Sequence, residues 1–328
     1  MLPRGSRFFH CRIQGAVHAI SVTAEAASPQ SIKACQITQC RRVGIQVNSA
    51  RAVVVARCHI SKCGSVEKRP SGAIVIAHSH HCRLLDNVIE NCAGYGVQLD
   101  QSSDNTVRGN TINSIGGRHR KPDGMGIALH EANRNLVLSN KVSEMNYMCL
   151  YVGDSADNLI IGNELRNSPD GLGMTGHKAT RNIIRDTLFG IDLWESHENV
   201  IEGNEISSKP VELGMRGDGI RAWASNGNLF RENRIHDSRD MIVWYSYNNR
   251  INQQTHSFGE YRLQRISPSA STLTRGNVGT AGGQARLLAI HGEDDAGDKV
   301  KGLVAKTKNV EAELVTEPVR ITCLLYTS

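Results

Sequence analysis

The chain is poor in the features that mark helical and membrane proteins. It has no run of about 18 apolar residues, so the sequence predicts no membrane-spanning helix. Residues 30–255 contain no amphipathic stretch of about 10 to 12 residues, which argues against any repeat with a helical return. Aromatic residues make up only 5% of the chain. The core is therefore expected to be narrow and built from small, β-branched side chains.

Asparagine, by contrast, recurs in pairs whose members lie five residues apart. The pairs are Asn105/Asn110, Asn135/Asn140, Asn158/Asn163, Asn199/Asn204 and Asn228/Asn233. Each pair encloses a short β-rich run, and a second run of the form Gly-Ile-x-Leu lies upstream, as at residues 126–129. Period-two alternation bounded by Gly, Asn, Asp and Ser predicts very short β-strands.

The second Asn of each pair marks the register of a repeat. Its slot falls at residues 11, 35, 58, 87, 110, 140, 163, 186, 204, 233 and 254, and the commonest step is 23 residues. A leucine-rich repeat has a similar period but needs Leu where this chain has Ile, Val and Asn. We therefore predict an all-β, single-stranded right-handed parallel β-helix of about ten coils. Asn would form ladders along the stack and would also tolerate a left-handed turn.

The repeat divides the chain into two segments. Residues 1–261 are predicted to form the β-helix, and residues 262–328 lose both the Asn pairs and the strand period. The last residues resemble translated adapter sequence, so we expect this tail to be disordered or to follow a frameshift. Neither a secretory signal nor a capping element precedes Cys11, which suggests a fragment or a mis-assigned start.

Six of the nine cysteines follow the same register. Cys11, Cys35 and Cys58 occupy the Asn slot, and Cys40, Cys63 and Cys92 lie five residues past it. Metal sites favour CxxC-type pairs or interleaved His, which these spacings match poorly. We interpret the cysteines as two stacked columns of buried thiols. Oxidation across coils remains an open alternative.

Positive charge gathers near the N-terminus. The whole chain carries a net charge of +6, while residues 1–70 hold Glu25 and Glu67 as their only acidic residues. A basic segment suits an anionic glycan, a nucleic acid or a membrane surface. Because the segment has no nucleic-acid motif, we expect no nucleic-acid partner and interpret it as a solvated face.

The upstream strand offers a surface for a ligand. In Gly-Ile-x-Leu-x the Ile and Leu point into the coil and both x residues point outward. From Asp100 onward these outward positions collect carboxylates, a histidine, an arginine and aromatic rings. Aromatic faces stack on sugar rings, and exposed aromatic surface marks binding sites. The predicted substrate-binding residues on this strip are Trp194, Trp223, Tyr245 and Tyr151.

Two pairs of outward residues, each one coil apart, suit acid–base chemistry. Asp192 and Arg221 form either a surface ion pair or part of a proton-abstraction site beside a sugar carboxylate. Asp100 and His130 suit general-base catalysis, although a solvated histidine is the commoner outcome. These four residues are the candidate catalytic residues. Whether the chain is an enzyme stays open; a polysaccharide lyase, an epimerase or a glycoside hydrolase would fit.

Three repeats carry an insertion at the same point, at residues 64–70, 116–123 and 208–217. Such loops would project to one side and wall the strip into a groove. The middle loop supplies a basic tip for a carboxylated or sulfated chain, formed by Arg118, His119, Arg120 and Lys121. Asp-Gly pairs before three strands are explained by turn chemistry. We expect no cofactor, with Ca²⁺ and copper as open alternatives.

Residues 71–261 resemble the right-handed parallel β-helix repeats of the carbohydrate-binding and sugar-hydrolase (CASH) type. Residues 217–223 and 237–246 are most similar to the periplasmic NosD-type proteins. The resemblance implies a module that binds an extended glycan or polysaccharide in the periplasm or outside the cell. The alternative that it implies is an accessory protein for copper supply to nitrous oxide reductase.

Two observations bear on these alternatives. Mannuronan epimerases of this fold carry Asp-Pro-His in the outward strand, where this chain has Asp192, Leu193 and Trp194. The acid is kept and the histidine is lost, which weakens an epimerase function through that motif. Copper delivery needs soft or imidazole ligands, and the strip itself offers His130 alone.

Overall fold

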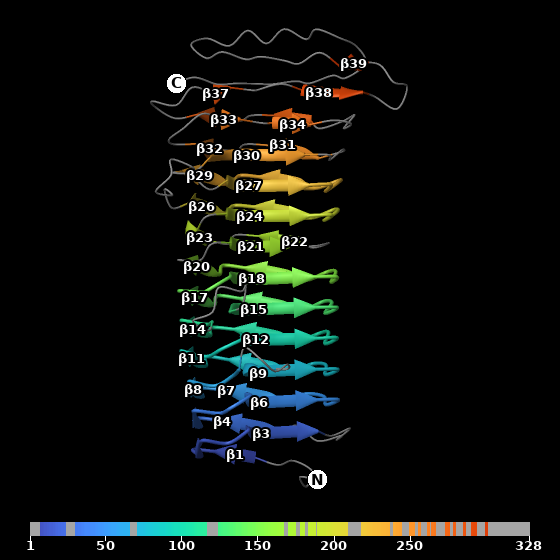
Figure 1. The fold of residues 1–328 in the computed structure, drawn as a ribbon. Helices are drawn as coiled ribbons and strands as arrows, with labels where there is room; N and C mark the ends of the chain where they lie inside the picture. The colour runs from blue at the N-terminus through green and yellow to red at the C-terminus, as the bar shows by residue number, and fades with distance from the viewer. Residues whose placement is uncertain are drawn as a thin grey trace. The chain divides into compact units, whose positions relative to one another are not determined.

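The computed structural model of the chain is built from short strands joined by tight turns, with no helix among the residues it describes (Figure 1). The structure describes residues 7–23, 30–65, 71–116, 124–166, 170–174, 178–180, 183–187, 189–208, 218–236, 239–244, 249–252, 255–256, 261–262, 264–266, 273–275, 278–279, 285–286, 290–293 and 299–300. The chain forms two compact units, Met1–Pro169 and Asp170–Ser328. Each unit is a stack of parallel β-coils.

In the first unit, three parallel sheets each receive one strand from every coil. The first sheet contains β1 (Arg7–Phe9), β4 (Ser31–Lys33), β7 (Val54–Ala56), β10 (Arg83–Leu85), β13 (Thr106–Arg108), β16 (Leu136–Leu138) and β19 (Leu159–Ile161). The second contains β2 (Arg12–Gln14), β5 (Gln36–Thr38), β8 (His59–Ser61), β11 (Val88–Glu90), β14 (Thr111–Asn113), β17 (Lys141–Ser143) and β20 (Glu164–Arg166). The third contains β3 (His18–Thr23), β6 (Val43–Asn48), β9 (Gly72–Ala77), β12 (Tyr95–Asp100), β15 (Met125–His130) and β18 (Met148–Gly153). About seven turns are stacked in this way.

The second unit repeats the arrangement. Its first sheet contains β22 (Lys178–Thr180), β25 (Val200–Glu202), β28 (Leu229–Arg231), β31 (Arg250–Asn252) and β35 (Leu273–Arg275). Its second contains β23 (Ile183–Thr187), β26 (Glu205–Ser208), β29 (Arg234–His236), β32 (Thr255–His256) and β36 (Val278–Gly279). Its third contains β21 (Asp170–Met174), β24 (Phe189–Trp194), β27 (Asp218–Trp223), β30 (Arg239–Trp244), β34 (Gln264–Ile266) and β38 (Ile290–Glu293), with β39 (Lys299–Val300) antiparallel to β38. β33 (Tyr261–Arg262) pairs separately with β37 (Ala285–Arg286).

The predicted fold class is confirmed. The first and the second sheet contain 12 strands each, slightly more than the roughly ten coils predicted. Short strands also occur past the predicted end of the β-helix at residue 261, and β35 pairs in parallel with β31. Residues 301–328 lie outside the described part of the chain. The boundary between β-helix and tail therefore stays a prediction.

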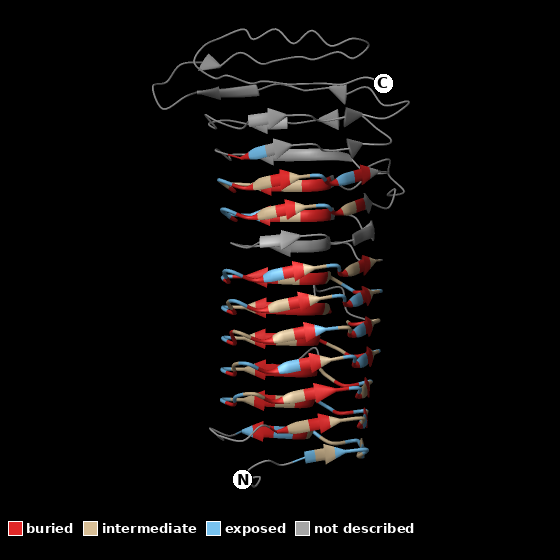
Figure 2. Cartoon of the chain, turned by 180° about the vertical axis from the view of Figure 1, so that it is seen from behind, coloured by how far each residue is buried: buried red, intermediate tan, exposed pale blue. Residues whose placement is uncertain are grey.

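The core of the first unit is a set of aliphatic columns inside the coil. In the second sheet Ile37, Ile60, Ile89 and Ile112 lie in register on successive strands, and all four are fully buried. Figure 2 shows buried residues alternating with partly exposed ones along the strands of this unit. Each such side chain contributes about 1.5 to 3 kcal/mol by leaving water. The alternation that predicted the strands also separates the core from the outer faces.

Asparagine ladders pair the buried backbone N–H and C=O groups at the turns between the first and second sheets. The backbone N–H and the Nδ2 of Asn87 both donate to Asn110 Oδ1, at 3.0 and 2.9 Å. Asn110 in turn donates to Asn140 Oδ1, and its Nδ2 also reaches the carbonyl of Leu84 at 3.0 Å. Similar chains of bonds join the ladder residues of the second unit, as between Asn204 and Asn233. The predicted ladders are confirmed.

The left-handed turn residue is not the ladder Asn itself but the residue before it. Asp86, Gly109 and Ser139 precede three ladder residues and have φ of 54°, 68° and 52°. The ladder Asn is therefore selected for its amide, and the glycine of the Gly-Asn motif supplies the turn conformation. The expectation that Asn occupies the slot because it tolerates a left-handed turn was wrong.

Serine forms a further polar column that the sequence pattern did not reveal. Ser79 Oγ accepts the backbone N–H of Ala50 at 3.0 Å, and Ser102 Oγ accepts that of Ser79 at 3.0 Å. In the second unit Ser225 Oγ accepts the N–H of Ser196 at 2.9 Å. These hydroxyls satisfy buried donors at the turn that follows the third sheet.

The cysteine columns are present as predicted. Cys35, Cys58, Cys40, Cys63 and Cys92 are buried and free, and Cys11 is free and partly exposed. The backbone N–H of Cys58 donates to Asn87 Oδ1 at 3.0 Å, so the thiol column continues the ladder. Burial raises the pKa of the Cys58 thiol to about 11. The thiol is therefore protonated and unreactive at neutral pH.

Asn110→Ala is expected to lower the free energy of unfolding by about 3 kcal/mol or more. The substitution leaves buried donors of Asn87 without an acceptor and removes the amide donor to Leu84, each loss costing about 1 to 3 kcal/mol. The control is Asn113→Ala, since Asn113 lies on an outer face and its loss should cost less than about 1 kcal/mol. Urea denaturation measures both; equal effects would contradict the ladder's role.

Cys58→Asn is expected to leave the stability within about 1 kcal/mol of the parent, because the slot holds Asn in the next coil. Cys58→Asp has almost the same shape but buries a carboxylate and should destabilise by several kcal/mol at neutral pH. The comparison uses thermal and urea unfolding. A Cys58→Asn variant as unstable as Cys58→Asp would show that the slot does not accept an amide.

Candidate functional site

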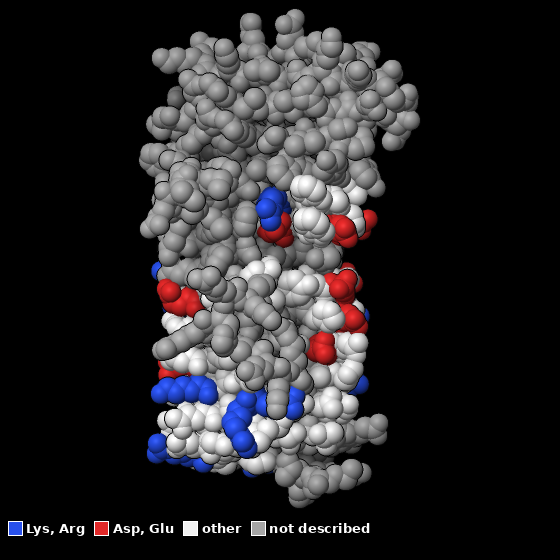
Figure 3. All heavy atoms as spheres, viewed as in Figure 1, with Lys and Arg blue, Asp and Glu red and all other residues white. Residues whose placement is uncertain are grey.

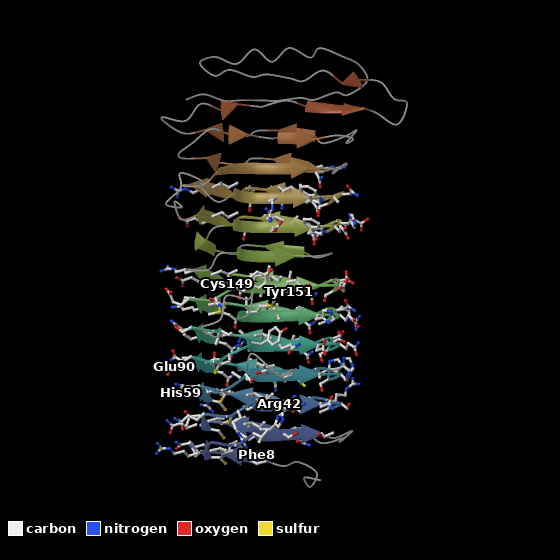
Figure 4. The ribbon with its side chains drawn as sticks, viewed as in Figure 1. Phe8, Arg42, His59, Glu90, Cys149 and Tyr151 are labelled. Carbon is white, nitrogen blue, oxygen red and sulfur yellow. The ribbon has the colours of Figure 1, made fainter. Side chains whose placement is uncertain are left out.

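In the first unit the outward positions of the third sheet line up in two rows. Val75, Gln98, Ala128 and Tyr151 are register partners on β9, β12, β15 and β18. Ala77, Asp100, His130 and Gly153 form the neighbouring row. A pocket of about 500 Å³ lies over these strands, lined by Val75, Ala77, Tyr95, Gln98, Asp100, Met125, Ala128, His130 and Tyr151. Figure 4 labels Tyr151 on β18.

The predicted Asp100–His130 pair is formed at the edge of this pocket. His130 Nδ1 lies 3.1 Å from Asp100 Oδ1, and His130 Nε2 lies 4.0 Å from Asp154 Oδ2. Both partners of the first contact keep access to solvent, with 43% and 36% of their side chains exposed. A carboxylate only accepts hydrogen bonds, so the Nδ1 of a neutral imidazole would carry the proton. Nε2 would then be free to act as a base.

Tyr151 lies across Gly153 of its own strand. A Cβ at position 153 would be 2.2 Å from the Tyr151 Oη, so only glycine leaves room for the ring. The pKa of Tyr151 is raised by burial first, and then by the Asp154 carboxylate and Tyr95. The hydroxyl is therefore a proton donor over the neutral pH range. The period places Gly153 on the outward strip, but no pattern in the sequence indicates that this glycine makes room for Tyr151.

In the second unit, the outward positions of β24 and β27 carry the predicted Asp192–Arg221 and Trp194–Trp223 pairs. Arg221 Nε donates to Asp192 Oδ1 at 3.1 Å, and Arg221 Nη2 donates to Asp192 Oδ2. The two side chains are largely buried, with 24% of Arg221 and 19% of Asp192 exposed. Both carboxylate oxygens are occupied, which is the geometry of a structural ion pair.

The indole rings of Trp194 and Trp223 are parallel, with centroids 5.3 Å apart and planes 3° apart. Trp194 is 51% exposed. A centroid separation larger than the contact distance of about 3.5 to 4.0 Å means that the rings are offset. Each ring therefore covers only part of the other, and the pair leaves ring edges and part of a face to a ligand.

The predicted place of Tyr245 in this aromatic column was wrong. The register pairs Trp223 with Trp244 and Arg221 with Ile242. The prediction placed Val243 and Tyr245 there, one residue out of register, and a shift of one residue exchanges the two faces of a strand. Tyr245 itself lies outside the described residues, and so do Arg118, His119, Arg120 and Lys121 of the basic tip. Most of the three inserted loops is likewise outside the described part.

Charge is unevenly distributed over the first unit. In Figure 3 lysine and arginine side chains gather over its first coils, and acidic side chains follow one edge further along it. Ion pairs join successive coils of this unit, such as Arg134 Nε with Asp104 Oδ1 at 2.8 Å. The basic segment predicted from the sequence, residues 1–70, thus comes before the Asp100–His130 pair in the chain.

The described residues offer no obvious metal centre. Among them, no group of three or more His, Cys, Asp or Glu is placed to hold an ion. The same part of the chain contains no helix that is long and apolar enough to cross a membrane.

Comparison with known proteins places the fold. Residues 2–165 and 125–255 match the family described as right-handed β-helix region. No curated protein matches the chain. Among solved structures, an alginate lyase, AlyF-OU02, with G6 is similar at a TM-score of 0.63 and 12% identity, over 85% of this chain and 75% of that one.

A second similar structure is the DFA-IIIase from Arthrobacter chlorophenolicus A6 in complex with GF2. Its TM-score is 0.57 at 10% identity, over 81% of this chain and 82% of that one. At these identities the likeness shows the fold alone. The match to the family covers most of the coils described above, and the chain belongs to the right-handed parallel β-helix family.

Proposed function

We propose that the chain binds a glycan, with the Trp194–Trp223 pair as the principal contact. The observation that carries the proposal is the stacking of the exposed Trp194 indole on the half-buried indole of Trp223, on the outer face of the second unit. An indole that packs on its neighbour is already restricted in its motion. It therefore loses little conformational entropy on binding and offers a rigid apolar surface to a sugar ring.

The neighbouring ion pair suits the same ligand. Asp192 and Arg221 neutralise one another yet keep lone pairs and N–H groups that sugar hydroxyls can share. A face with apolar rings and a few fixed polar groups is typical of carbohydrate sites. The two similar solved structures, an alginate lyase with G6 and a DFA-IIIase with GF2, support a glycan ligand on this fold.

Catalysis at Asp192 has less support than binding. Arg221 donates to both carboxylate oxygens of Asp192, so the carboxylate is held in a two-point ion pair instead of being directed at a substrate proton. We therefore propose that Asp192 and Arg221 organise the binding face. The NosD-type copper role has no supporting ligand cluster in the described residues. A periplasmic or extracellular location is part of the proposal, through the resemblance to secreted β-helix repeats.

Trp223→Ala and Trp194→Ala are each expected to weaken glycan binding about 10-fold or more, the equivalent of about 1.4 kcal/mol. Isothermal titration with a neutral hexasaccharide and a hexauronate of the same length measures the effect and the preference for charge. Leu159→Ala is the control, because Leu159 is also exposed, at 43%, but lies on β19 of the first unit. Unchanged binding in both tryptophan variants, or no binding by the parent chain, would refute the proposal.

A double-mutant cycle on Asp192→Asn and Arg221→Gln is expected to give a coupling energy of about 1 kcal/mol in urea unfolding. Each single variant takes the ion-pair partner away from a largely buried polar side chain, so the double variant should be more stable than the sum of the singles predicts. Additive effects would mean that the two side chains do not act as a pair in solution.

A further inference from the structure

The pocket of the first unit is lined by other residues than the Trp194–Trp223 face. Its floor is formed by the short outward side chains Val75, Ala77 and Ala128, and two tyrosines line it with Met125 and Gln98. A volume of about 500 Å³ falls within the range of about 300 to 1,000 Å³ found for small-molecule sites. Val75 and Ala128 are buried even though they point away from the coil interior. The geometry therefore provides an apolar floor with polar groups along one row.

That row brings a base and an acid together. Asp100 holds His130 through Nδ1, which leaves Nε2 to the pocket because Asp154 Oδ2, at 4.0 Å, is beyond hydrogen-bond distance. His130 is the register partner of Gly153, and the Tyr151 hydroxyl lies directly over Gly153. An oriented imidazole and a protonated phenol therefore occupy adjacent places on neighbouring strands. This is the arrangement of a general base beside a hydrogen-bond donor.

The charges of the described row favour a neutral substrate over two of the sugar chemistries considered for this fold. The described lining contains no lysine or arginine, while Asp100 and the nearby Asp154 are acidic, so a uronate carboxylate would find repulsion instead of neutralisation. Glycoside hydrolysis needs two carboxyl groups that face each other across the scissile bond. Here the imidazole of His130 stands between Asp100 and Asp154. A neutral group that needs one base and one donor fits better.

We propose that this pocket hydrolyses an O-acyl ester carried by a neutral sugar. His130 Nε2 takes a proton from a water molecule while the water oxygen attacks the ester carbonyl carbon. The Tyr151 hydroxyl donates a hydrogen bond to the carbonyl oxygen as it becomes negative. The bond between the acyl carbon and the sugar oxygen then breaks, and the imidazolium returns its proton to that oxygen, releasing a carboxylic acid and the sugar alcohol.

Asp100 acts through His130 and is a positioning residue, whereas His130 and Tyr151 contact the reacting atoms. The choice of a sugar as the acyl carrier rests on the proposed glycan function, but the ester chemistry does not. A small aryl ester therefore tests the site by itself, and an acetylated neutral polysaccharide tests the natural class of substrate.

The structure provides a matched control for His130. His59 Nε2 lies 3.0 Å from Glu90 Oε1, and the two side chains are 44% and 42% exposed, close to the values for His130 and Asp100. His59 and Glu90 lie on β8 and β11 of the second sheet, and neither lines the pocket (Figure 4). The two pairs differ mainly in whether a pocket and a tyrosine stand beside the histidine.

The experiment follows hydrolysis of p-nitrophenyl acetate and release of acetate from O-acetylated glucomannan by the full chain. His130→Ala and His130→Gln are expected to lower kcat at least about 100-fold, and Tyr151→Phe about 100-fold. Gly153→Ala should match Tyr151→Phe, because the added Cβ displaces the ring. His59→Ala should leave both rates unchanged.

Two further measurements separate chemistry from folding. Added imidazole should restore part of the p-nitrophenyl acetate activity of His130→Ala, which a merely structural histidine would not allow. Asp100→Asn should lower kcat at least about 10-fold with little change in KM, because the carboxylate orients the base without touching substrate.

The proposal is overturned if the parent chain hydrolyses neither ester, if His59→Ala loses as much activity as His130→Ala, or if the sugar product is unsaturated. Failure of the glycan proposal looks different: Trp223→Ala and the parent would both fail to bind glycans while p-nitrophenyl acetate hydrolysis persists. Loss of hydrolysis in His130→Ala with intact glycan binding would support both proposals together.

Discussion

The hydrogen bond from one asparagine to the next coil's asparagine is the interaction on which the rest of the structure depends. A coil of short strands must turn between sheets, and each turn buries a backbone N–H that has no strand partner. Asn110 Oδ1 accepts a hydrogen bond from the backbone N–H of Asn87. The backbone N–H and the Nδ2 of Asn110 donate in turn to Asn140 Oδ1. Since an unpaired buried donor costs about 1 to 3 kcal/mol, the ladder also penalises any slip in register.

Register then determines chemistry. When successive coils stack without slipping, residues at equivalent positions become neighbours about 4.8 Å apart, whatever their separation in sequence. The thiols of Cys35 and Cys58, the indoles of Trp194 and Trp223, and the row from Asp100 to Gly153 all arise in this way. The solenoid thus builds sites by aligning one residue from each coil, and an outer face can change without altering the ladder that supports it.

The two histidine–carboxylate pairs of the first unit show how surroundings separate a structural contact from a candidate site. His59 with Glu90 and His130 with Asp100 have similar distances and similar exposure. Only the second pair, among the described residues, lines a pocket with an apolar floor and has a tyrosine hydroxyl over the residue that is its histidine's register partner, Gly153. In the second unit the guanidinium of Arg221 instead donates to both carboxylate oxygens of Asp192, an arrangement that favours binding over proton transfer.

The sequence by itself determined the fold class, the ladders, the thiol columns and the Asp100–His130 and Asp192–Arg221 pairs, because all of these follow from a period. It missed the serine column, since Ser79 and Ser102 lie where no repeated motif draws attention. It misplaced Tyr245, because a one-residue uncertainty in a strand of period two exchanges its faces. The tertiary structure alone decided that Tyr151 lies over Gly153, that Arg221 bonds both oxygens of Asp192, and that a pocket opens beside His130. Those facts depend on side-chain direction and on the space left by neighbours, which a repeat in one dimension does not encode.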